Sequence, residues 1–295
     1  MSASGTIPLP QDLLLIHAHE RTMTFHGWVL LAEDNLVNQE VAREILASLG
    51  CQIDLAANGE EAVVMACRTA YDVIFMDCQM PVMDGFAATR AIRTNEALQR
   101  QKHIPVIALT AHAAEEDRKQ CLAMGMDDYL SKPFSPEALS TVLRRWLRPH
   151  TQRPPTLEET TEPQRSETTS HHAAASPGVA PIDIKVLDTL RALPRGAASL
   201  KQVLRTYLKA TPSLVAALQD AISRGDASAV RQAAHSLRSS SAAVGALSLA
   251  ALCKALEDMG RANTLTTAHT LLGRLEAEYA AVCAALEREL PHDAA

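Results

Sequence analysis

Five short apolar runs alternate with amphipathic segments in the first half of the chain, and this alternation limits the fold more than any other feature. The runs cover residues 28–33, 51–57, 72–77, 105–110 and 128–132. The helices that apolar spacing predicts after them cover residues 35–49, 59–70, 86–93, 115–124 and 136–147. Runs that are apolar throughout are typical of strands buried on both faces of a parallel sheet. We therefore predict an α/β domain, a doubly wound five-stranded parallel sheet.

The second half of the chain carries no strand pattern, and its apolar residues recur at helical spacing instead. Residues 204–222 are interpreted as two consecutive helices that restart at Thr211-Pro212, because proline is tolerated in the first turn of a helix but not in its interior. Gly225 and Asp226 predict the end of one helix and the N-cap of the next. Short turns between amphipathic helices predict an all-α antiparallel helical bundle.

Residues 149–181 separate the two halves. This segment holds six prolines and runs of Thr and Ser, and it has almost no large apolar residue. Such a sequence cannot bury enough surface to offset the entropy lost on ordering, which predicts a flexible linker. The predicted organisation is an N-terminal extension (1–26), an α/β domain (27–148), this linker, and a helical bundle (182–290).

The composition excludes several classes of function. The formal net charge is −6, and a chain of this charge is not expected to bind nucleic acid. No apolar run reaches the roughly 20 residues that a membrane helix needs, and no basic segment precedes the first one, so we expect no membrane insertion and no signal peptide. The six cysteines show no metal-like spacing, which favours the reducing cytoplasm and free thiols.

Four of the predicted strands end in polar residues. The first ends at Glu33 and Asp34, the third at Asp77, the fourth at Thr110 and the fifth at Lys132. The carboxyl ends of parallel strands meet at one edge of a sheet, so these side chains should share a pocket. Three carboxylates repel one another unless a hard cation such as Mg²⁺ joins them, and a lysine and a hydroxyl suit phosphoryl oxygens. A single aspartate at a strand end usually caps a turn, but this combination predicts a pocket that phosphorylates a carboxylate.

Four motifs give the first half a resemblance to the receiver domain of two-component response regulators. They are LLAEDN (30–35), MDCQMPVMDG (76–85), ALTA (108–111) and KPF (132–134). The resemblance covers about residues 27–148 and implies the flavodoxin-like fold of that family. It implies that Asp77 is the phosphoacceptor and that Mg²⁺ is the cofactor. The protein ligands would be Asp77, Asp34, Glu33 partly through water, and the backbone carbonyl of Gln79.

The same resemblance implies roles for three further residues. Thr110 and Lys132 would contact the phosphoryl oxygens, and the Lys132-Pro133 peptide bond would be cis. Tyr129 would be the aromatic switch residue beside Thr110.

A phosphatase of the haloacid dehalogenase type is the alternative for these residue types. Those hydrolases combine an aspartate nucleophile, Mg²⁺, a Thr or Ser and a Lys, and they place a second aspartate two residues after the nucleophile as general acid and base. Gln79 occupies that position here and cannot carry a proton. An acyl phosphate on Asp77 should therefore persist, and we expect a phosphotransfer protein rather than an enzyme.

His235 has the most informative surroundings of the histidines in the helical half. It lies in AAHSLRSSSAAVGA (233–246), where Arg238 and Ser239 share its helical face. The small residues Ser239, Ser240 and Ser241 would form a docking face on which another protein could approach the imidazole, and a nearby cation would balance an added phosphoryl group. The segment resembles the histidine phosphotransfer (HPt) domain over about residues 182–290, which implies that His235 is phosphorylated. That family commonly has Lys and Gly where this chain has Arg238 and Ser239.

These observations predict a phosphorelay signal transduction protein. Asp77 would accept a phosphoryl group from a phosphohistidine, and His235 would relay it to or from a receiver aspartate. The expected partners are a sensor histidine kinase and the receiver domain of another response regulator, and the linker also allows transfer within the chain.

Two alternatives stay open. The domain order resembles the C-terminal part of hybrid sensor histidine kinases, although this sequence carries no ATP-binding boxes, so the chain could be a fragment or a shortened relative of such a kinase. It could also be a docking module that Asp77 phosphorylation controls, without histidine transfer.

Overall fold

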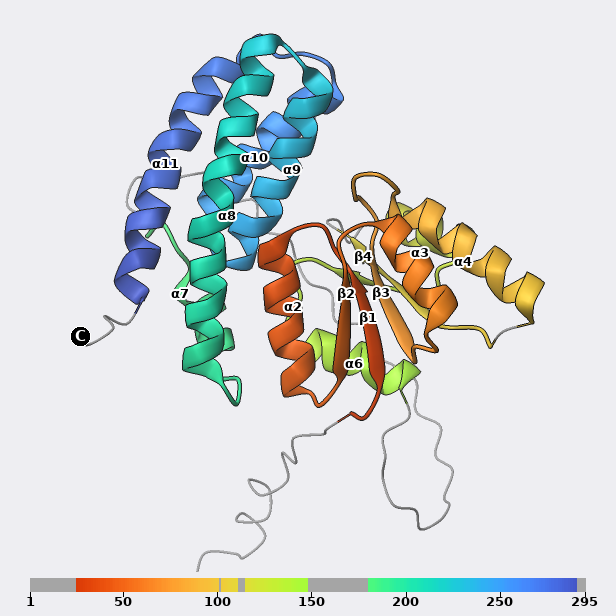
Figure 1. Cartoon of the computed structure of the whole chain (residues 1–295). Coiled ribbons are helices and arrows are strands. Elements are labelled where there is room, and N and C mark those ends of the chain that lie inside the picture. The colour runs from red at the N-terminus through yellow and green to blue at the C-terminus, as the bar shows by residue number, and fades with distance from the viewer. Residues whose placement is uncertain (1–24, 101, 111–114, 148–179, 291–295) are drawn as a thin grey trace, which may run out of the picture.

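The chain folds into a sheet domain and a helical bundle that lie side by side (Figure 1). The computed structural model describes residues 25–100, 102–110, 115–147 and 180–290. The predicted extension up to residue 24 and the predicted linker up to residue 179 lie outside the described residues. Phe25 is fully buried and its backbone N–H donates to the Leu49 carbonyl. This residue therefore packs with the sheet domain, although it precedes the predicted start at residue 27.

The sheet consists of five parallel strands in the order β2-β1-β3-β4-β5, which confirms the predicted doubly wound topology. The strands are β1 (Trp28–Ala32), β2 (Gln52–Ala56), β3 (Val73–Asp77), β4 (Val106–Thr110) and β5 (Asp128–Ser131). The helices that follow them are α2 (Leu36–Ser48), α3 (Gly59–Arg68), α4 (Gly85–Gln99), α5 (Glu115–Ala123) and α6 (Pro136–Trp146).

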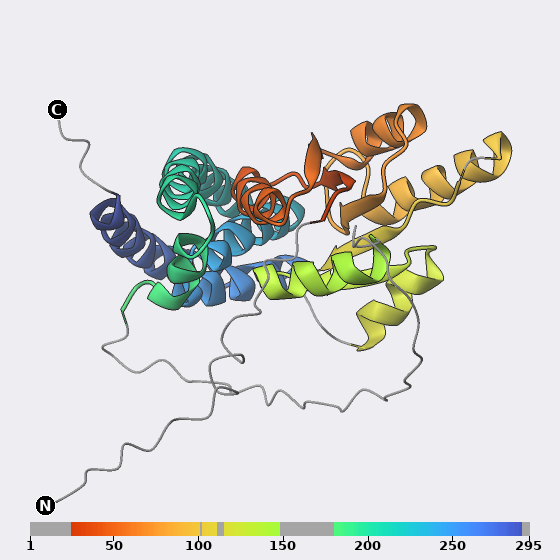
Figure 2. The same ribbon diagram turned by 90° about the horizontal axis from the view of Figure 1, so that it is seen from below.

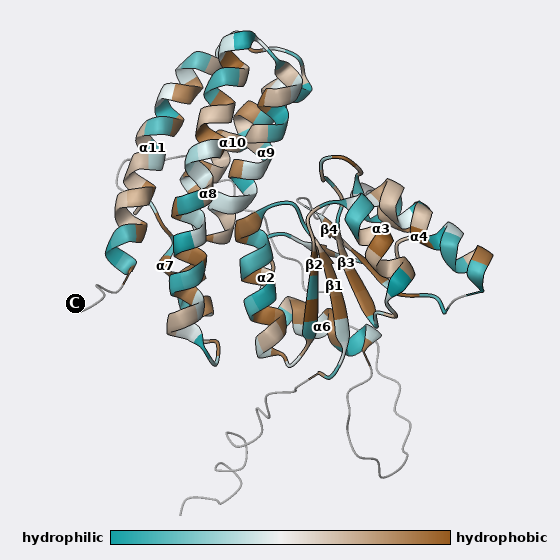
Figure 3. Ribbon diagram, in the orientation of Figure 1, coloured by the Kyte–Doolittle hydropathy of each residue, from teal (hydrophilic) through white to brown (hydrophobic). Residues whose placement is uncertain are grey.

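Alternate residues of the strands face two different layers of helices, as the two-residue period of a strand requires. Leu31 and Phe75 belong to a buried cluster that includes side chains of α2 and α6. Leu30 and Ile74 belong to a second cluster that includes side chains of α3, α4 and α5. The inner strands β1, β3 and β4 are therefore covered on both faces, which explains why their sequences are apolar almost throughout, whereas the edge strands β2 and β5 are more polar and less buried (Figure 3).

Helix α4 is longer than predicted. It continues to Gln99, so the predicted end at Arg93 was wrong. Long-range polar contacts hold the additional turns in place: the buried Glu96 carboxylate accepts from the backbone N–H of Ile104 (2.8 Å), and Arg93 donates to the Gly125 carbonyl (3.0 Å). A buried carboxylate interrupts the apolar spacing, so this pattern predicted too short a helix.

The helical half forms the predicted antiparallel bundle (Figure 1). Its helices are α7 (Ile184–Arg191), α8 (Gly196–Arg224), α9 (Ala227–Ala243), α10 (Leu247–Arg261) and α11 (Ala268–Glu289). Gly225 ends α8 in the left-handed region (φ 68°), and the Asp226 side chain caps α9 by accepting from the backbone N–H of Ala229. Both of these signals were predicted correctly.

The predicted restart at Thr211-Pro212 was wrong, because α8 passes through Pro212 as one helix. Pro212 removes one hydrogen bond of the helix, but the packing around it outweighs this loss. Thr211 is fully buried, and its hydroxyl donates to the Tyr207 carbonyl (2.8 Å) and lies 2.9 Å from the Tyr279 hydroxyl of α11. Tyr207 is itself fully buried in the bundle. Packing against the bundle therefore keeps the helix continuous.

Helix α2 lies between the sheet and α8 of the bundle (Figure 2). Its buried side chains, such as Ile45 and Leu46, belong to one cluster that extends from the sheet into the bundle, where it includes Leu200 and Leu204 of α8. Among the described residues, no helix combines the length and the apolar character needed to cross a membrane.

Gly85, the first residue of α4, offers a test of how the sheet edge is built. A Cβ at this position would lie 2.1 Å from the Asp77 carbonyl oxygen, so Gly85→Ala must displace the end of β3. Overpacking of this kind costs about 1–3 kcal/mol of unfolding free energy, to be measured by denaturant titration.

Gly273→Ala is the matched control. A Cβ at Gly273, inside α11, meets no atom within 4 Å, so the helix propensity of alanine should stabilise the protein by up to about 1 kcal/mol. A Gly85→Ala protein as stable as the wild type would contradict the described packing.

Candidate functional site

Three carboxylates lie together at the carboxyl edge of the sheet. Glu33 and Asp34 directly follow β1, and Asp77 is the last residue of β3. Since β1 and β3 are neighbours in the sheet, one oxygen of each carboxylate lies within 4.8 Å of the others. Glu33 and Asp77 are buried, and Asp34 is partly buried. The predicted convergence of these strand ends is therefore confirmed.

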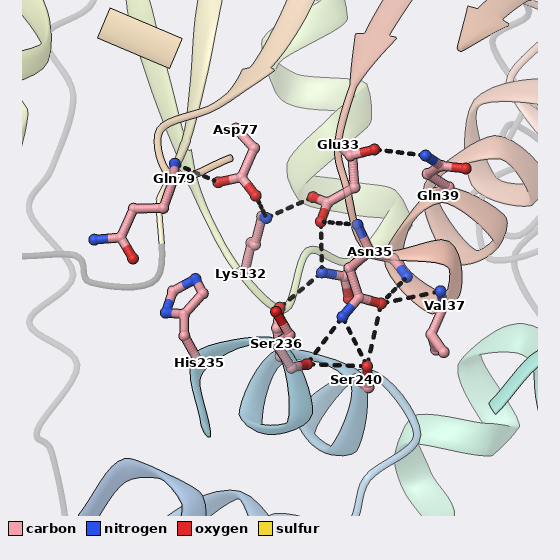
Figure 4. A network of polar contacts seen from close by, with 12 residues as sticks. Glu33, Asn35, Val37, Gln39, Asp77, Gln79, Lys132, His235, Ser236 and Ser240 are labelled. Atoms are coloured by element: carbon pink, nitrogen blue, oxygen red, sulfur yellow. Dashed lines mark hydrogen bonds and ion pairs between the residues drawn. The ribbon is translucent and has the colours of Figure 1, made fainter. Parts of the chain in front are cut away.

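Lys132 reaches into this acidic cluster from the end of β5. Its Nζ lies 2.5 Å from Glu33 Oε2 and 2.7 Å from Asp77 Oδ2 (Figure 4). The Lys132-Pro133 peptide bond is cis, as predicted. One ammonium does not neutralise three carboxylates, so the site remains negative. Carboxylate oxygens at this spacing are the ligands that a hard divalent cation prefers, and the residues therefore fit Mg²⁺.

The pKa values of the cluster reflect its burial and its crowded charges. Burial, together with the charge of Asp77, raises the pKa of Glu33 to about 7, although Lys132 opposes the shift. Burial and the charge of Asp77 also raise the pKa of Asp34. Burial alone would lower the pKa of Lys132, but the charges of Asp77 and Glu33 outweigh it and raise that pKa above its usual range. Burial and, to a smaller extent, mutual repulsion thus disfavour the charged forms of Glu33 and Asp34, and a bound cation would favour these charged forms.

The remaining residues predicted at this edge lie around the same site. Thr110 ends β4 and is buried. Gln79 is exposed, and its backbone N–H donates to Asp77 Oδ1 (3.2 Å). Tyr129 lies on β5 next to β4 and is partly buried, with the Arg118 guanidinium carbon 5.7 Å from its ring centroid.

The structure brings His235 of the bundle to the acidic cluster. A cavity of about 160 Å³ is lined by Asp77, Thr110 and Lys132 from the sheet domain and by His235 from α9. Figure 4 shows the imidazole on the opposite side of this cavity from the Asp77 and Lys132 side chains. The predicted linker is long enough to allow contact between the two domains, but the sequence did not predict that they would be in contact.

Glu257 is a residue of this site that sequence reasoning missed. It lies on α10 and is almost completely buried, and its Oε1 is 3.1 Å from His235 Nδ1. The Arg238 Nε lies 3.1 Å from Oε2, and Arg261 also contacts the carboxylate. Burial would raise the pKa of Glu257, but the hydrogen bond with His235 and the charges of these neighbours outweigh it, so the pKa is lowered.

An ionised Glu257 requires a proton on the facing nitrogen. Arg238 Nη2 also lies 3.4 Å from His235 Nδ1, but the carboxylate is closer and the guanidinium is already paired with Glu257. We therefore assign the Nδ1–H tautomer, which leaves the lone pair on Nε2. No spacing rule within α9 could have revealed a partner on another helix.

Polar side chains of α2 and α9 join the two domains beside the cavity. The Asn35 amide donates to Ser240 Oγ (2.8 Å), and the Asn38 amide donates to Ser239 Oγ (2.7 Å). We expected Ser241 on this docking face as well, but Ser241 is buried inside the bundle, where its hydroxyl lies 3.3 Å from the Tyr207 hydroxyl. Consecutive residues of a helix point about 100° apart, so Ser241 faces the interior of the bundle while Ser240 faces the receiver domain.

Comparisons with known proteins agree with this architecture. The family model of the response regulator receiver domain matches residues 29–144, and that of the Hpt domain matches residues 202–285. Hybrid signal transduction histidine kinase B of Dictyostelium discoideum is 41% identical over 130 residues, which is 41% of this chain and 6% of that protein. Sensor protein GacS of Pseudomonas syringae pv. syringae is 41% identical over 118 residues, which is 40% of this chain and 13% of that protein.

A solved structure is also similar to the first half. It is the receiver domain of a sensor histidine kinase from Pseudomonas aeruginosa, crystallised with a magnesium ion in its active-site cleft. The identity is 50%, the match covers 41% of this chain and 97% of that one, and the TM-score is 0.38. The chain thus spans a small part of the two curated kinases but nearly all of this receiver domain.

The first half of the chain is therefore a receiver domain of the response-regulator family. The second half contains a histidine phosphotransfer domain, so this chain joins two modules of phosphorelay signalling.

The role of Glu257 can be tested by nitrogen NMR of the His235 imidazole. Glu257→Ala removes the acceptor of the Nδ1–H, so the Nε2–H tautomer should become populated. Glu257→Gln keeps an acceptor oxygen and should preserve the Nδ1–H tautomer. If His235 keeps the Nδ1–H tautomer fully in Glu257→Ala, Glu257 does not orient the ring.

Proposed function

We propose that Asp77 accepts a phosphoryl group in a Mg²⁺-dependent reaction and that His235 exchanges this group with Asp77 of the same chain. The cavity that both side chains line is the observation that supports this proposal. A volume of about 160 Å³ is several times the roughly 30 Å³ that a water molecule takes in the liquid, so the cavity has room for a group larger than water.

The proposed metal ligands are the carboxylates of Glu33, Asp34 and Asp77 and the backbone carbonyl of Gln79. Support comes from the 4.8 Å spacing of the carboxylate oxygens and from the charge that Lys132 leaves unbalanced. A bound Mg²⁺ would neutralise part of this charge and of the charge on the phosphoryl oxygens.

In the proposed transfer, the lone pair of His235 Nε2 attacks the phosphorus of the Asp77 acyl phosphate. The nitrogen–phosphorus bond forms while the bond from phosphorus to the Asp77 oxygen breaks, and the electron pair returns to the carboxylate. Lys132 donates to that carboxylate and stabilises the returning charge. The imidazole becomes positive and keeps its proton on Nδ1, where the Glu257 carboxylate balances it. The reverse reaction phosphorylates Asp77.

Thr110 and Tyr129 are proposed to respond to the phosphoryl group. Thr110 lines the cavity, so its hydroxyl can donate to a phosphoryl oxygen. Tyr129 is proposed to turn inward as Thr110 moves, away from the Arg118 guanidinium that now lies over its ring.

The proposal extends to partners outside the chain. A sensor histidine kinase is the proposed source of phosphoryl groups, and the receiver domain of another response regulator is a further partner for His235. The curated relatives are sensor and hybrid histidine kinases, which supports placing this chain in such a pathway. The cytoplasm is the proposed location.

Labelling with acetyl phosphate tests both acceptor residues. The wild type should gain a hydroxylamine-sensitive acyl phosphate on Asp77 and an acid-labile phosphate on His235. Asp77→Asn should gain neither from this donor, whereas His235→Gln should gain only the acyl phosphate. Equal acid-labile labelling of wild type and His235→Gln would exclude His235 as the acceptor.

Magnesium removal tests the metal site. Because the phosphoryl group and the carboxylates repel each other without a cation, EDTA should reduce Asp77 labelling at least about tenfold. Asp34→Asn should shift the labelling curve to higher Mg²⁺ concentration. Asp258→Asn is the control, since Asp258 is an exposed carboxylate that pairs with Lys254 on α10. Equal Mg²⁺ dependence in Asp34→Asn and the wild type would rule out Asp34 as a ligand.

A further inference from the structure

Two amide–hydroxyl pairs join the receiver and HPt domains next to the phosphoryl-transfer cavity. They are Asn35 with Ser240 and Asn38 with Ser239 (Figure 4 shows the first pair). Asn35, Asn38 and Ser240 are buried, and Ser239 is partly buried. Buried polar groups are nearly always hydrogen-bonded, and here part of that bonding comes from the other domain, so these contacts can discriminate between partners.

The Asn35–Ser240 pair is reciprocal. The Asn35 amide donates to Ser240 Oγ (2.8 Å) and to the Ser236 carbonyl (2.9 Å), and Ser240 Oγ lies 3.1 Å from Asn35 Oδ1. The same Oδ1 caps α2 by accepting from the backbone N–H of Val37 (3.0 Å). One side chain thus caps its own helix and uses its amide hydrogens on α9 of the other domain.

The Asn38–Ser239 pair connects the docking contact with the acidic cluster. The Asn38 amide donates to Ser239 Oγ (2.7 Å) and to Glu33 Oε1 (2.9 Å). Both amide hydrogens are therefore used, one in each domain. Ser239 occupies the position at which the HPt pattern commonly has glycine, and its hydroxyl is the atom that Asn38 contacts.

We infer that the Asn35–Ser240 and Asn38–Ser239 pairs select this chain's own receiver domain as the partner of its HPt domain. The inference rests on the proposed transfer between Asp77 and His235. A receiver with aliphatic side chains at the positions of Asn35 and Asn38 would lose the amide bonds to Ser240 and Ser239, although the Ser240 hydroxyl would keep its bond to the Ser236 carbonyl (3.0 Å). Conversely, an HPt domain with glycine at the position of Ser239 would leave one amide hydrogen of the buried Asn38 without its acceptor. Leaving a buried polar group unpaired disfavours docking by tenfold or more, which is enough to discriminate between receivers.

The size of the paired side chains makes the selection directional. Ser240 is fully buried, so an asparagine in its place would collide with Asn35. Asn35→Ser removes that collision and still supplies a good N-cap for α2, because serine and asparagine cap helices about equally well. Exchanging the two residues therefore keeps the number of donors and the approximate volume while reversing which domain carries the amide.

The test uses the full-length chain as wild type, Asn35→Ser, Ser240→Asn and the double variant. After a pulse of acetyl phosphate, the rate of acid-labile phosphate formation on His235 is expressed per acyl phosphate on Asp77. Each single substitution should slow this transfer at least about tenfold, and the double variant should recover to within about threefold of wild type. Ser223→Asn is the matched control, because Ser223 lies on an exposed part of α8 and its hydroxyl donates to the Gln219 carbonyl.

Small-angle X-ray scattering of the unphosphorylated chains gives a readout that does not depend on transfer. The single variants should have a larger radius of gyration than the wild type and the double variant, because undocked domains separate on their linker. A wild type that docks but transfers nothing would refute the proposed function. The scattering would still show whether the Asn35–Ser240 pair controls docking. Single variants that remain compact and transfer normally, or a double variant no better than the singles, would overturn the inference.

Discussion

The functional edge of the receiver domain depends on the ion pairs that the Lys132 ammonium makes with Glu33 and Asp77. Burying even one carboxylate is costly, and Glu33 and Asp77 are both buried beside the third carboxylate, Asp34. Lys132 contacts two of the three and makes their burial tolerable. Lys132 can reach the carboxylates only if β5 ends at the same edge of the sheet as β1 and β3. The topology of the sheet and the charges of the site therefore depend on each other. Removing this lysine would leave buried charges uncompensated, a loss of about 3–5 kcal/mol in comparable pairs.

The negative charge of this edge also determines what can dock beside it. The HPt domain presents an imidazole at the cavity and holds its own carboxylate, Glu257, behind the ring. The contacts next to the cavity are neutral amide–hydroxyl pairs, so docking adds no further charge to the acidic cluster. Apolar side chains of α2 and α8 belong to one buried cluster and also hold the two domains together. The polar pairs add direction and selectivity to this apolar contact.

Most of the receiver domain could be predicted from the sequence because its signals are local. Apolar runs predict buried strands, and a parallel sheet brings Glu33, Asp77 and Lys132 to one edge whatever the details of the loops. The contacts that were missed join residues far apart in the chain. Glu257 faces His235 from another helix, and Asn35 faces Ser240 from another domain, and neither pair has a characteristic spacing.

The errors in the predicted helices have the same origin. The predicted end of α4 and the predicted break at Pro212 both applied rules that hold for an isolated helix. In the folded chain, Glu96 binds the backbone of Ile104, and the hydroxyl of Thr211 on α8 contacts Tyr279 of α11. Tertiary contacts decided both outcomes against local propensity.

A shared cavity has a consequence for the proposed relay. Asp77 and His235 line the same space of about 160 Å³, and a phosphoryl group carries close to two negative charges near neutral pH. Two such groups facing each other across an already acidic site would repel strongly, so a docked chain accommodates one phosphoryl group and a second one favours separation of the domains. Under the proposed function, docking is then coupled to the number of phosphoryl groups on the chain. The neutral pairs of α2 and α9 are suited to this coupling, because they hold the domains together but carry no charge that would offset the repulsion between two phosphoryl groups.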